Sequence, residues 1–345
     1  SMMMYLREPF KYYERFFKDF SDRRKYWQTL IDLNKGTMQS GLEYALPKST
    51  VYVEKKEGET DCKTVRKWIQ QVDFTETLTY FSRIGIPLSF GNKNAKTYII
   101  CRDAVEYLTK EEIDKLLTKP CIIDGEAFKY LSDKYDCFNA TAETVSEFGI
   151  KRLYKRYVDS PLTHSLKGVK MNKTWDGCTM VKIHPKDESV MPLAEYYCET
   201  KEIKPENSKY PYGITDAIIT TDKGAKWAVF GENLWDWQVT YQRKKFYLKA
   251  GEYISGEKLK AEILNDQACF LLPRENKEGK TTSVSVLNPA IGELRPKIVI
   301  RNPKTEKFVF INEFGKEKEL KAKKTADGYL MTLPALKGWH LETVY

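Results

Sequence analysis

The chain has 345 residues, of which 41% are hydrophobic, 30% charged and 13% aromatic, and this high aromatic content excludes a largely disordered protein. Its seven cysteines and three histidines form no CxxC pair and no metal-ligand cluster in the sequence, so we expect no disulfide framework, metal site or cofactor. No apolar run reaches the roughly 20 residues of a membrane-spanning helix, so no membrane partner is expected.

The compartment and the charge of the chain give two further expectations. An odd number of scattered cysteines suits a reducing compartment, and the first ten residues contain no apolar segment of an export signal. We expect a cytoplasmic protein, while export of a longer parent protein stays open. Most of the net charge of +9 lies between Tyr241 and Thr325, where lysines alternate with glutamates as on solvated strand faces. No nucleic-acid partner is therefore expected.

Residues 1–40 are predicted to form a helical segment. Apolar and aromatic residues recur there at three- and four-residue steps, with charged residues between them. A short break separates two helices, and Ser21 or Asp22 is the expected N-cap of the second. The segment is too small to fold alone, so its aromatic stripe is expected to pack against another part of the protein.

Residues 41–210 are predicted to form an α/β domain, because short buried strands alternate with helical patterns. At this spacing they predict right-handed βαβ units and a mainly parallel sheet, doubly wound in the flavodoxin-like manner. Strands are expected at 49–54, 97–101 and 120–124, and helices at 64–84, at 109–117 after a capping box, and at 126–134.

Residues 211–345 are predicted to form a linker helix and a β-sandwich. The apolar period becomes two, and turn residues separate about eight short strands. A helix at 237–248, capped near Asp236, is expected to join the two domains. The strands are expected at 217–221, 227–230, 268–273, 283–287, 297–301, 307–311, 329–333 and 341–345.

Several segments follow one another in a characteristic order. They are IPLS (86–89), AVEYLTKEEIDKLL (104–117), CIIDGEA (121–127), VDSPL (158–162), WAVFG (227–231), LLPR (271–274), SVSVLNPA (283–290) and LPALKGW (333–339). Together they resemble the region downstream of the catalytic barrel in bacterial β-galactosidase-like glycoside hydrolases of the family 42 type and their uncharacterised relatives.

The resemblance implies a class I glutamine amidotransferase-like "trimerisation" domain followed by a β-sandwich. It places residues 1–40 at the junction with a catalytic barrel that is not in this chain. The implied role is accessory or assembly, with a homo-oligomer or the parent protein's barrel as partner. Because the barrel and its two acidic residues are missing from the chain, the resemblance transfers no activity.

An amidotransferase-like fold usually carries a nucleophilic cysteine at a sharp strand-to-helix turn, with a histidine as its partner. The best such turn here spans 123–126, and neither Cys nor Ser occupies it. Cys121 lies early in the buried strand, and His164 and His184 show no triad spacing. We expect no catalytic residue, although an independent hydrolase or amidotransferase-like enzyme remains an alternative.

Two acidic residues lie where a parallel sheet would bind a ligand. Asp124 and Glu126 follow the strand at 120–124, at its carboxyl end. They could hold a cation or a sugar hydroxyl. The structural alternative, which we favour, is that Asp124 caps the next helix and Glu126 interacts with its positive end.

The stretch at 231–237 is a second candidate ligand site. Trp235 and Trp237 could stack on sugar rings, while Glu232 and Asn233 could bind hydroxyl groups. The structural alternative, which we favour, is that both Trp residues begin a buried helix between the domains.

A carbohydrate-binding module is therefore a further alternative function. It would require exposed aromatic rings in one plane, and Trp227 and Trp339 join the two Trp residues above as candidates. We expect Trp339 to lie in the core. Glu232 and Asp236 could also pass as a carboxylate pair for glycoside hydrolysis, but their proximity in sequence gives no distance between them.

Overall fold

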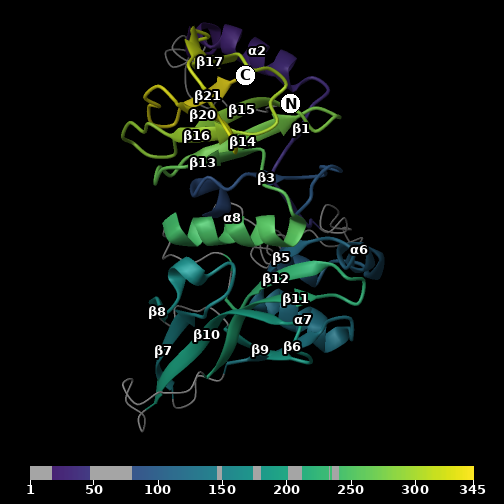
Figure 1. The fold of residues 1–345 in the computed structure, drawn as a ribbon. Coiled ribbons are helices and arrows are strands. Elements are labelled where there is room, and N and C mark those ends of the chain that lie inside the picture. Colours follow the sequence, from purple (N-terminus) through teal and green to yellow (C-terminus); the bar gives the residue numbers. More distant parts are fainter. Residues whose placement is uncertain are drawn as a thin grey trace, which may run out of the picture. The chain divides into compact units, whose positions relative to one another are not determined.

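The computed structural model describes residues 18–46, 80–145, 150–173, 180–200, 212–232, 234 and 241–345. The chain divides into two compact units (Figure 1). Unit 1 combines the described residues up to 39 with residues 260–345, and unit 2 comprises those between 40 and 259. Each unit has its own hydrophobic core. The predicted strand at 49–54 and most of the predicted helix at 64–84 lie outside the described residues.

Unit 2 is built on one mixed sheet. Its strands are β2 (Leu42–Tyr44), β3 (Leu88–Ser89), β4 (Tyr98–Ile100), β5 (Cys121–Asp124), β6 (Ala140–Thr144), β7 (Ile150–Tyr157), β8 (Lys170–Lys173), β9 (Val181–Pro185), β10 (Met191–Thr200), β11 (Gly213–Thr220) and β12 (Lys226–Phe230). Their order is β3-β2-β4-β5-β12-β11-β10-β7-β8, with β9 pairing to β11 and β6.

The sheet of unit 2 has a parallel half and an antiparallel half. The neighbours from β3 to β12 are all parallel. In chain order these five strands lie second, first, third, fourth and fifth. From β12 to β8 every pairing is antiparallel. The prediction of a mainly parallel sheet therefore holds only from β3 to β12, and it is wrong for the remaining strands, which are antiparallel.

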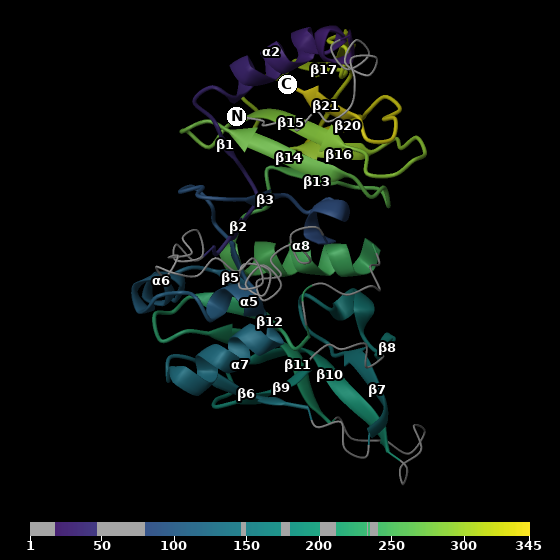
Figure 2. The same cartoon turned by 180° about the vertical axis from the view of Figure 1, so that it is seen from behind.

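Helices cover both faces of the parallel half. They are α5 (Arg102–Val105), α6 (Lys110–Leu116), α7 (Gly125–Lys134) and α8 (Tyr241–Ser255). Neighbouring residues of β5 point to opposite faces, so Ile122 packs in the core with α8, while Ile123 packs in the core with α6 and α7. The views from opposite sides show α8 on one face and α5 and α7 on the other (Figures 1 and 2).

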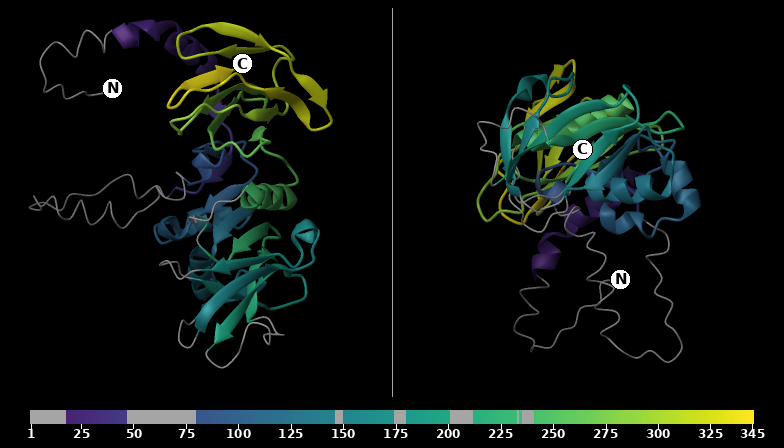
Figure 3. Two further views of the ribbon diagram at one scale, coloured as in Figure 1. Left: turned by 90° about the vertical axis from the view of Figure 1, so that its left-hand side faces the viewer. Right: turned by 90° about the horizontal axis from the view of Figure 1, so that it is seen from below.

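Unit 1 is a sandwich of two antiparallel sheets. Its strands are β1 (Met38–Gln39), β13 (Ala261–Ile263), β14 (Phe270–Glu275), β15 (Thr281–Leu287), β16 (Lys297–Ile300), β17 (Phe308–Ile311), β18 (Glu317–Leu320), β19 (Lys323–Thr325), β20 (Gly328–Thr332) and β21 (Leu341–Val344). One sheet has the order β1-β14-β15-β21-β17-β18, and the other β13-β16-β20-β19. Side chains of both sheets share one core, and both layers are visible in Figure 3.

The observed division of the chain differs from the predicted one. Strands β11 and β12 lie beyond the predicted boundary at residue 210, yet β12 pairs in parallel with β5 and both belong to unit 2. At the other end, helix α2 (Arg24–Asn34) belongs to unit 1, where Tyr26 and Leu30 pack with Ile311. Local periodicity identifies a strand, but it does not say which sheet the strand joins.

The observed helix N-caps agree with the sequence prediction for one helix and differ from it for another. The capping box at Thr109 is confirmed, because its side chain accepts from Glu112 N and the Glu112 side chain accepts from Thr109 N. Neither Ser21 nor Asp22 is the N-cap of α2; Arg23 occupies that position and makes no side-chain cap. In the part of the chain that the structure describes, no helix is long and apolar enough to cross a membrane.

Candidate functional site

The candidate residues Asp124, Glu126 and Glu232 lie at the same edge of the unit 2 sheet. Asp124 is the register partner of Phe230, at the ends of the parallel strands β5 and β12. The backbone segments that follow β5 and β12 lie close together at Gly125 and Gly231. A Cβ on Gly125 would lie 2.7 Å from the carbonyl carbon of Gly231. This is the edge where open α/β sheets bind their ligands.

Asp124 ties together the beginnings of two helices. Its Oδ1 accepts a hydrogen bond of 2.7 Å from Ala127 N, in the N-cap position of α7. Its Oδ2 accepts one of 2.7 Å from Arg102 N, at the beginning of α5. The carboxylate is buried, so both oxygens serve backbone donors, as the structural alternative describes.

Glu126 forms an ion pair beside this cap. Arg102 Nη1 lies 2.8 Å and 2.7 Å from its two carboxylate oxygens. The Arg102 side chain is 54% exposed and that of Glu126 is 11% exposed. The pair lies in the first turn of α7, where a carboxylate is favoured by the helix dipole. No group of three potential metal ligands occurs among the described residues.

Glu232 belongs to a buried group of ionisable side chains, here named the charged cluster: Lys155, Asp216, Glu232 and Arg243. Lys155 Nζ lies 2.6 Å from Asp216 Oδ2 and 3.6 Å from Glu232 Oε1. Arg243 Nη2 lies 3.5 Å from Glu232 Oε2. Their side chains are only 0–5% exposed. The cluster links β7, β11, the end of β12 and α8.

Two tyrosines extend the charged cluster. The Tyr196 hydroxyl donates to Glu232 Oε1 at 3.4 Å. Arg243 Nε donates to the Tyr247 hydroxyl at 2.8 Å, and that hydroxyl donates to Leu234 O at 3.2 Å. Burial raises the pKa of both tyrosines well above its usual range, and the nearby Glu232 charge raises that of Tyr196 further. Both phenols therefore remain protonated and act as hydrogen-bond donors.

The arrangement of the charged cluster favours a structural role. A glycoside hydrolase needs one protonated and one ionised carboxyl group on either side of an accessible bond. Here Asp216 and Glu232 are instead both ion-paired with the same residue, Lys155. Their side chains are 0% and 4% exposed, so neither is presented to a substrate.

Three members of the charged cluster were not identified from the sequence. Asp216 is a single acid inside the apolar run GITDAIIT of β11, which could have marked it as a buried charge. Lys155 and Arg243 lie in segments rich in basic residues and stand out by no pattern. Only the pairing of distant strands brings them together.

The candidate Trp residues have different environments. Asn233, Trp235, Asp236 and Trp237 lie outside the described residues, so their part in a site remains a prediction. Trp227 is fully buried, and its Nε1 donates to Lys119 O at 2.9 Å. It therefore serves packing and offers no surface to a sugar.

The expectation that Trp339 lies in the core is wrong. Its side chain is 67% exposed, and its backbone has a φ of 62°, a conformation that bulky residues rarely adopt. Trp339 N donates to Asn288 O at 2.7 Å. A Cβ on the preceding Gly338 would lie 2.3 Å from Ala290 O. This close approach of two loops fixes the turn and directs Trp339 outward.

Asn288 holds these two loops together. Its buried side chain donates to Gly292 O at 2.7 Å and to Leu336 O at 2.9 Å, and its Oδ1 accepts from Ala290 N at 2.8 Å. The loop that follows β15 also contains an apolar residue, Ile291, whose side chain is 95% exposed. The hydrogen-bonded pair of loops thus carries two exposed apolar side chains, Trp339 and Ile291.

No protein-family model matches the chain, and no curated protein matches it. Its fold is similar to that of α-L-fucosidase isoenzyme 2 from Paenibacillus thiaminolyticus, with a TM-score of 0.55 and 11% identity. The match covers 89% of this chain and 48% of the fucosidase chain, so this chain spans about half the length of that protein. At this identity the likeness shows the fold alone.

A second solved structure is a cycloisomaltooligosaccharide glucanotransferase from a Paenibacillus species. It shares 6% identity, over 74% of this chain and 53% of that one. Its TM-score of 0.18 is too low to support an argument about the fold.

Proposed function

We propose that this chain is a non-catalytic accessory and assembly portion of a carbohydrate-active protein. The observation that carries the proposal is the fold shared with an α-L-fucosidase over nearly all of this chain but only 48% of that enzyme. The sequence segments that resemble β-galactosidase-like proteins of the family 42 type point to the same kind of parent. On this proposal a catalytic barrel or further copies of the chain are its partners.

The amidotransferase-like character of unit 2 belongs to the same proposal. The order of its five parallel strands is that of flavodoxin-like sheets, which supports it. The antiparallel strands β11, β10, β7 and β8 are an addition to that pattern. They also supply two of the four members of the charged cluster, Lys155 and Asp216.

The environments of Cys121, His164 and His184 support the proposal that the chain carries no amidotransferase chemistry. Cys121 is fully buried, and burial raises its thiol pKa well above the usual range, which disfavours a reactive thiolate. His164 Nδ1 lies 2.9 Å from Asp159, and His184 Nε2 lies 3.5 Å from Glu143. Both histidines are thus engaged with surface carboxylates.

The test combines native mass with an activity assay of the full chain. Light scattering over a dilution series should show a stable oligomer, and a monomer at every concentration would remove the assembly role. Chromogenic fucosides and galactosides should not be turned over. Turnover that is lost in Glu232→Gln but retained in Glu126→Gln would instead identify a hydrolase that uses the charged cluster.

One observation favours a second candidate function, carbohydrate binding. Trp339 is exposed and has a positive φ, and a strained backbone at an exposed aromatic residue suggests a functional use. A neutral-glycan array should then detect binding that Trp339→Ala abolishes and that Trp27→Ala, on the surface of α2, leaves intact. Equal binding by the two variants would remove Trp339 from the site.

A further inference from the structure

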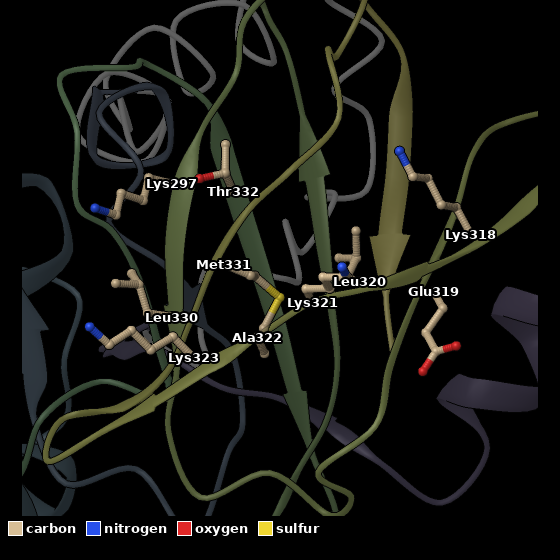
Figure 4. Close-up of a pocket in the computed structure, with 10 residues that line it drawn as sticks. All are labelled: Lys297, Lys318, Glu319, Leu320, Lys321, Ala322, Lys323, Leu330, Met331 and Thr332. Atoms are coloured by element: carbon tan, nitrogen blue, oxygen red, sulfur yellow. The ribbon is translucent and has the colours of Figure 1, made fainter.

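Unit 1 carries a hollow of about 600 Å³ at the edges of its two sheets. Strands β16, β18, β19 and β20 and the connection between β18 and β19 surround it (Figure 4). We call it the lysine groove. It is lined by Lys297, Lys318, Glu319, Leu320, Lys321, Ala322, Lys323, Leu330, Met331 and Thr332.

The charge of the lysine groove is one-sided. Four of its lining residues are lysines and one, Glu319, is acidic. None of the four lysines forms an ion pair within the part of the chain that the structure describes. Other lysines of unit 1 do: Lys324 lies 2.9 Å from Glu306, and Lys25 lies 3.3 Å from Glu317. The groove therefore has a net positive charge that the unit does not neutralise.

Edge protection explains only part of this pattern. Strands β18 and β19 are the outer strands of their sheets, and lysines on outer strands prevent pairing with other chains. Lys297, however, lies on β16, which has a neighbouring strand on each side. In register it is opposite Thr332, while Lys323 is opposite Leu330, so neighbouring strands contribute to one face. Protection of the outer strands therefore does not explain why Lys297 lines the same groove as the lysines of those strands.

The lining also limits what the groove can bind. Its volume lies in the range of small-ligand sites, too small for a folded partner. Leu320, Ala322 and Leu330 add apolar surface to the lining. No aromatic residue lines it, so it lacks the stacking platform that single-stranded nucleic acids use.

We infer that the lysine groove binds a short anionic oligosaccharide that carries carboxylate or sulfate groups. Lysine ammonium groups act as mobile point charges for such anions, and the apolar side chains contact the C–H faces of the sugar rings. The choice of a sugar as the carrier of the charge rests on the carbohydrate-active role proposed above. The charge complementarity itself does not depend on that role.

The test uses the full chain and two probes, an oligogalacturonide for carboxylate groups and a heparin-derived oligosaccharide for sulfate groups. Titration calorimetry should detect binding of at least one probe that weakens as salt is added. The variant Lys297→Ala/Lys318→Ala/Lys321→Ala should lose about ten-fold in affinity, since each exposed ion contact contributes modestly. A neutral oligosaccharide of equal length should bind no better to the original chain than to the variant.

The control removes the same charge elsewhere on unit 1. In Lys277→Ala/Lys280→Ala/Lys307→Ala, all three substituted residues are exposed and lie outside the groove, so affinity should change by less than about two-fold. Equal losses in the two variants would show nonspecific attraction and overturn the inference. So would groove-dependent binding of an oligothymidylate in place of either sugar. Native mass is independent of these results, so the assembly proposal fails or survives separately.

Discussion

The substitution Glu342→Gln should change how the stability of unit 1 depends on pH. Glu342 lies on β21 and is 6% exposed, and among the described residues its Oε2 has no hydrogen-bond partner. Burial, followed by the Glu313 charge, raises its pKa from 4.5 to about 7. Between these two values the folded protein holds a proton that the unfolded chain has lost. The free energy of unfolding should therefore fall as pH rises through this window.

The size of the effect follows from the pKa values. Each tenfold difference in proton affinity corresponds to about 1.4 kcal/mol, so ionised Glu342 destabilises the fold by roughly 3 kcal/mol at a pH above 7. Glutamine keeps the shape and carries no charge. The stability difference between Glu342→Gln and the original chain should thus be small below pH 4.5 and grow in favour of the variant up to about pH 7.

Urea denaturation of both proteins at a series of pH values measures this difference. Hydrogen exchange in peptides that contain β17 and β21 assigns the transition to unit 1, because the two units need not unfold together. Glu319→Gln, on the exposed face of β18, is the matched control and should leave the pH profile unchanged. A stability difference that is the same at every pH would refute the assignment of a raised pKa to Glu342.

Three further substitutions test the packing described above, each by urea denaturation. Asp124→Ala should lower the free energy of unfolding by about 1–2 kcal/mol, because two helix N-termini lose an acceptor; a change within error would contradict this role. Lys155→Met should lower the free energy of unfolding by about 3–5 kcal/mol, since Asp216 then stays buried without its ion-pair partner. Adding Asp216→Asn should recover part of this loss. Additive losses would argue against an energetic coupling between Lys155 and Asp216. Trp339→Asn should raise the free energy of unfolding by about 0.5–1 kcal/mol, because Asn tolerates a positive φ, and a decrease would show that the indole contributes packing.

Local signals in the sequence identified single elements well. The capping box at Thr109, the buried strand β5 and the alternation along β14 depend on neighbouring residues, and each is confirmed. The alternating lysines and glutamates of β18 and β19 were attributed to solvated strand faces, but these residues lack an apolar period, so no individual strands were predicted there. The lysine groove was not predicted either, because it is formed by strands of two different sheets.

Long-range pairing was the part that the sequence left open. β12 was placed in the sandwich because its run KWAVF resembles the other short strands, and only its pairing with β5 assigns it to unit 2. The candidate site shows the same limit. Glu232 was selected for the Trp residues near it in sequence, whereas its observed partners, Lys155 and Arg243, come from a distant strand and a helix. Trp339 stands alone in its segment, so no periodicity indicated that it would be exposed.

The division of the chain also has a consequence for how the protein is made. Unit 2 is inserted in sequence between the two parts of unit 1. On the ribosome, Tyr26 and Leu30 of α2 emerge early, but Ile311, with which they pack, is synthesised last of the three. At about 5–20 residues per second the delay is on the order of tens of seconds. During translation the apolar face of α2 therefore stays without its packing partner Ile311 for this time. Unit 2 can fold first, whereas unit 1 is completed only when its last strands leave the ribosome.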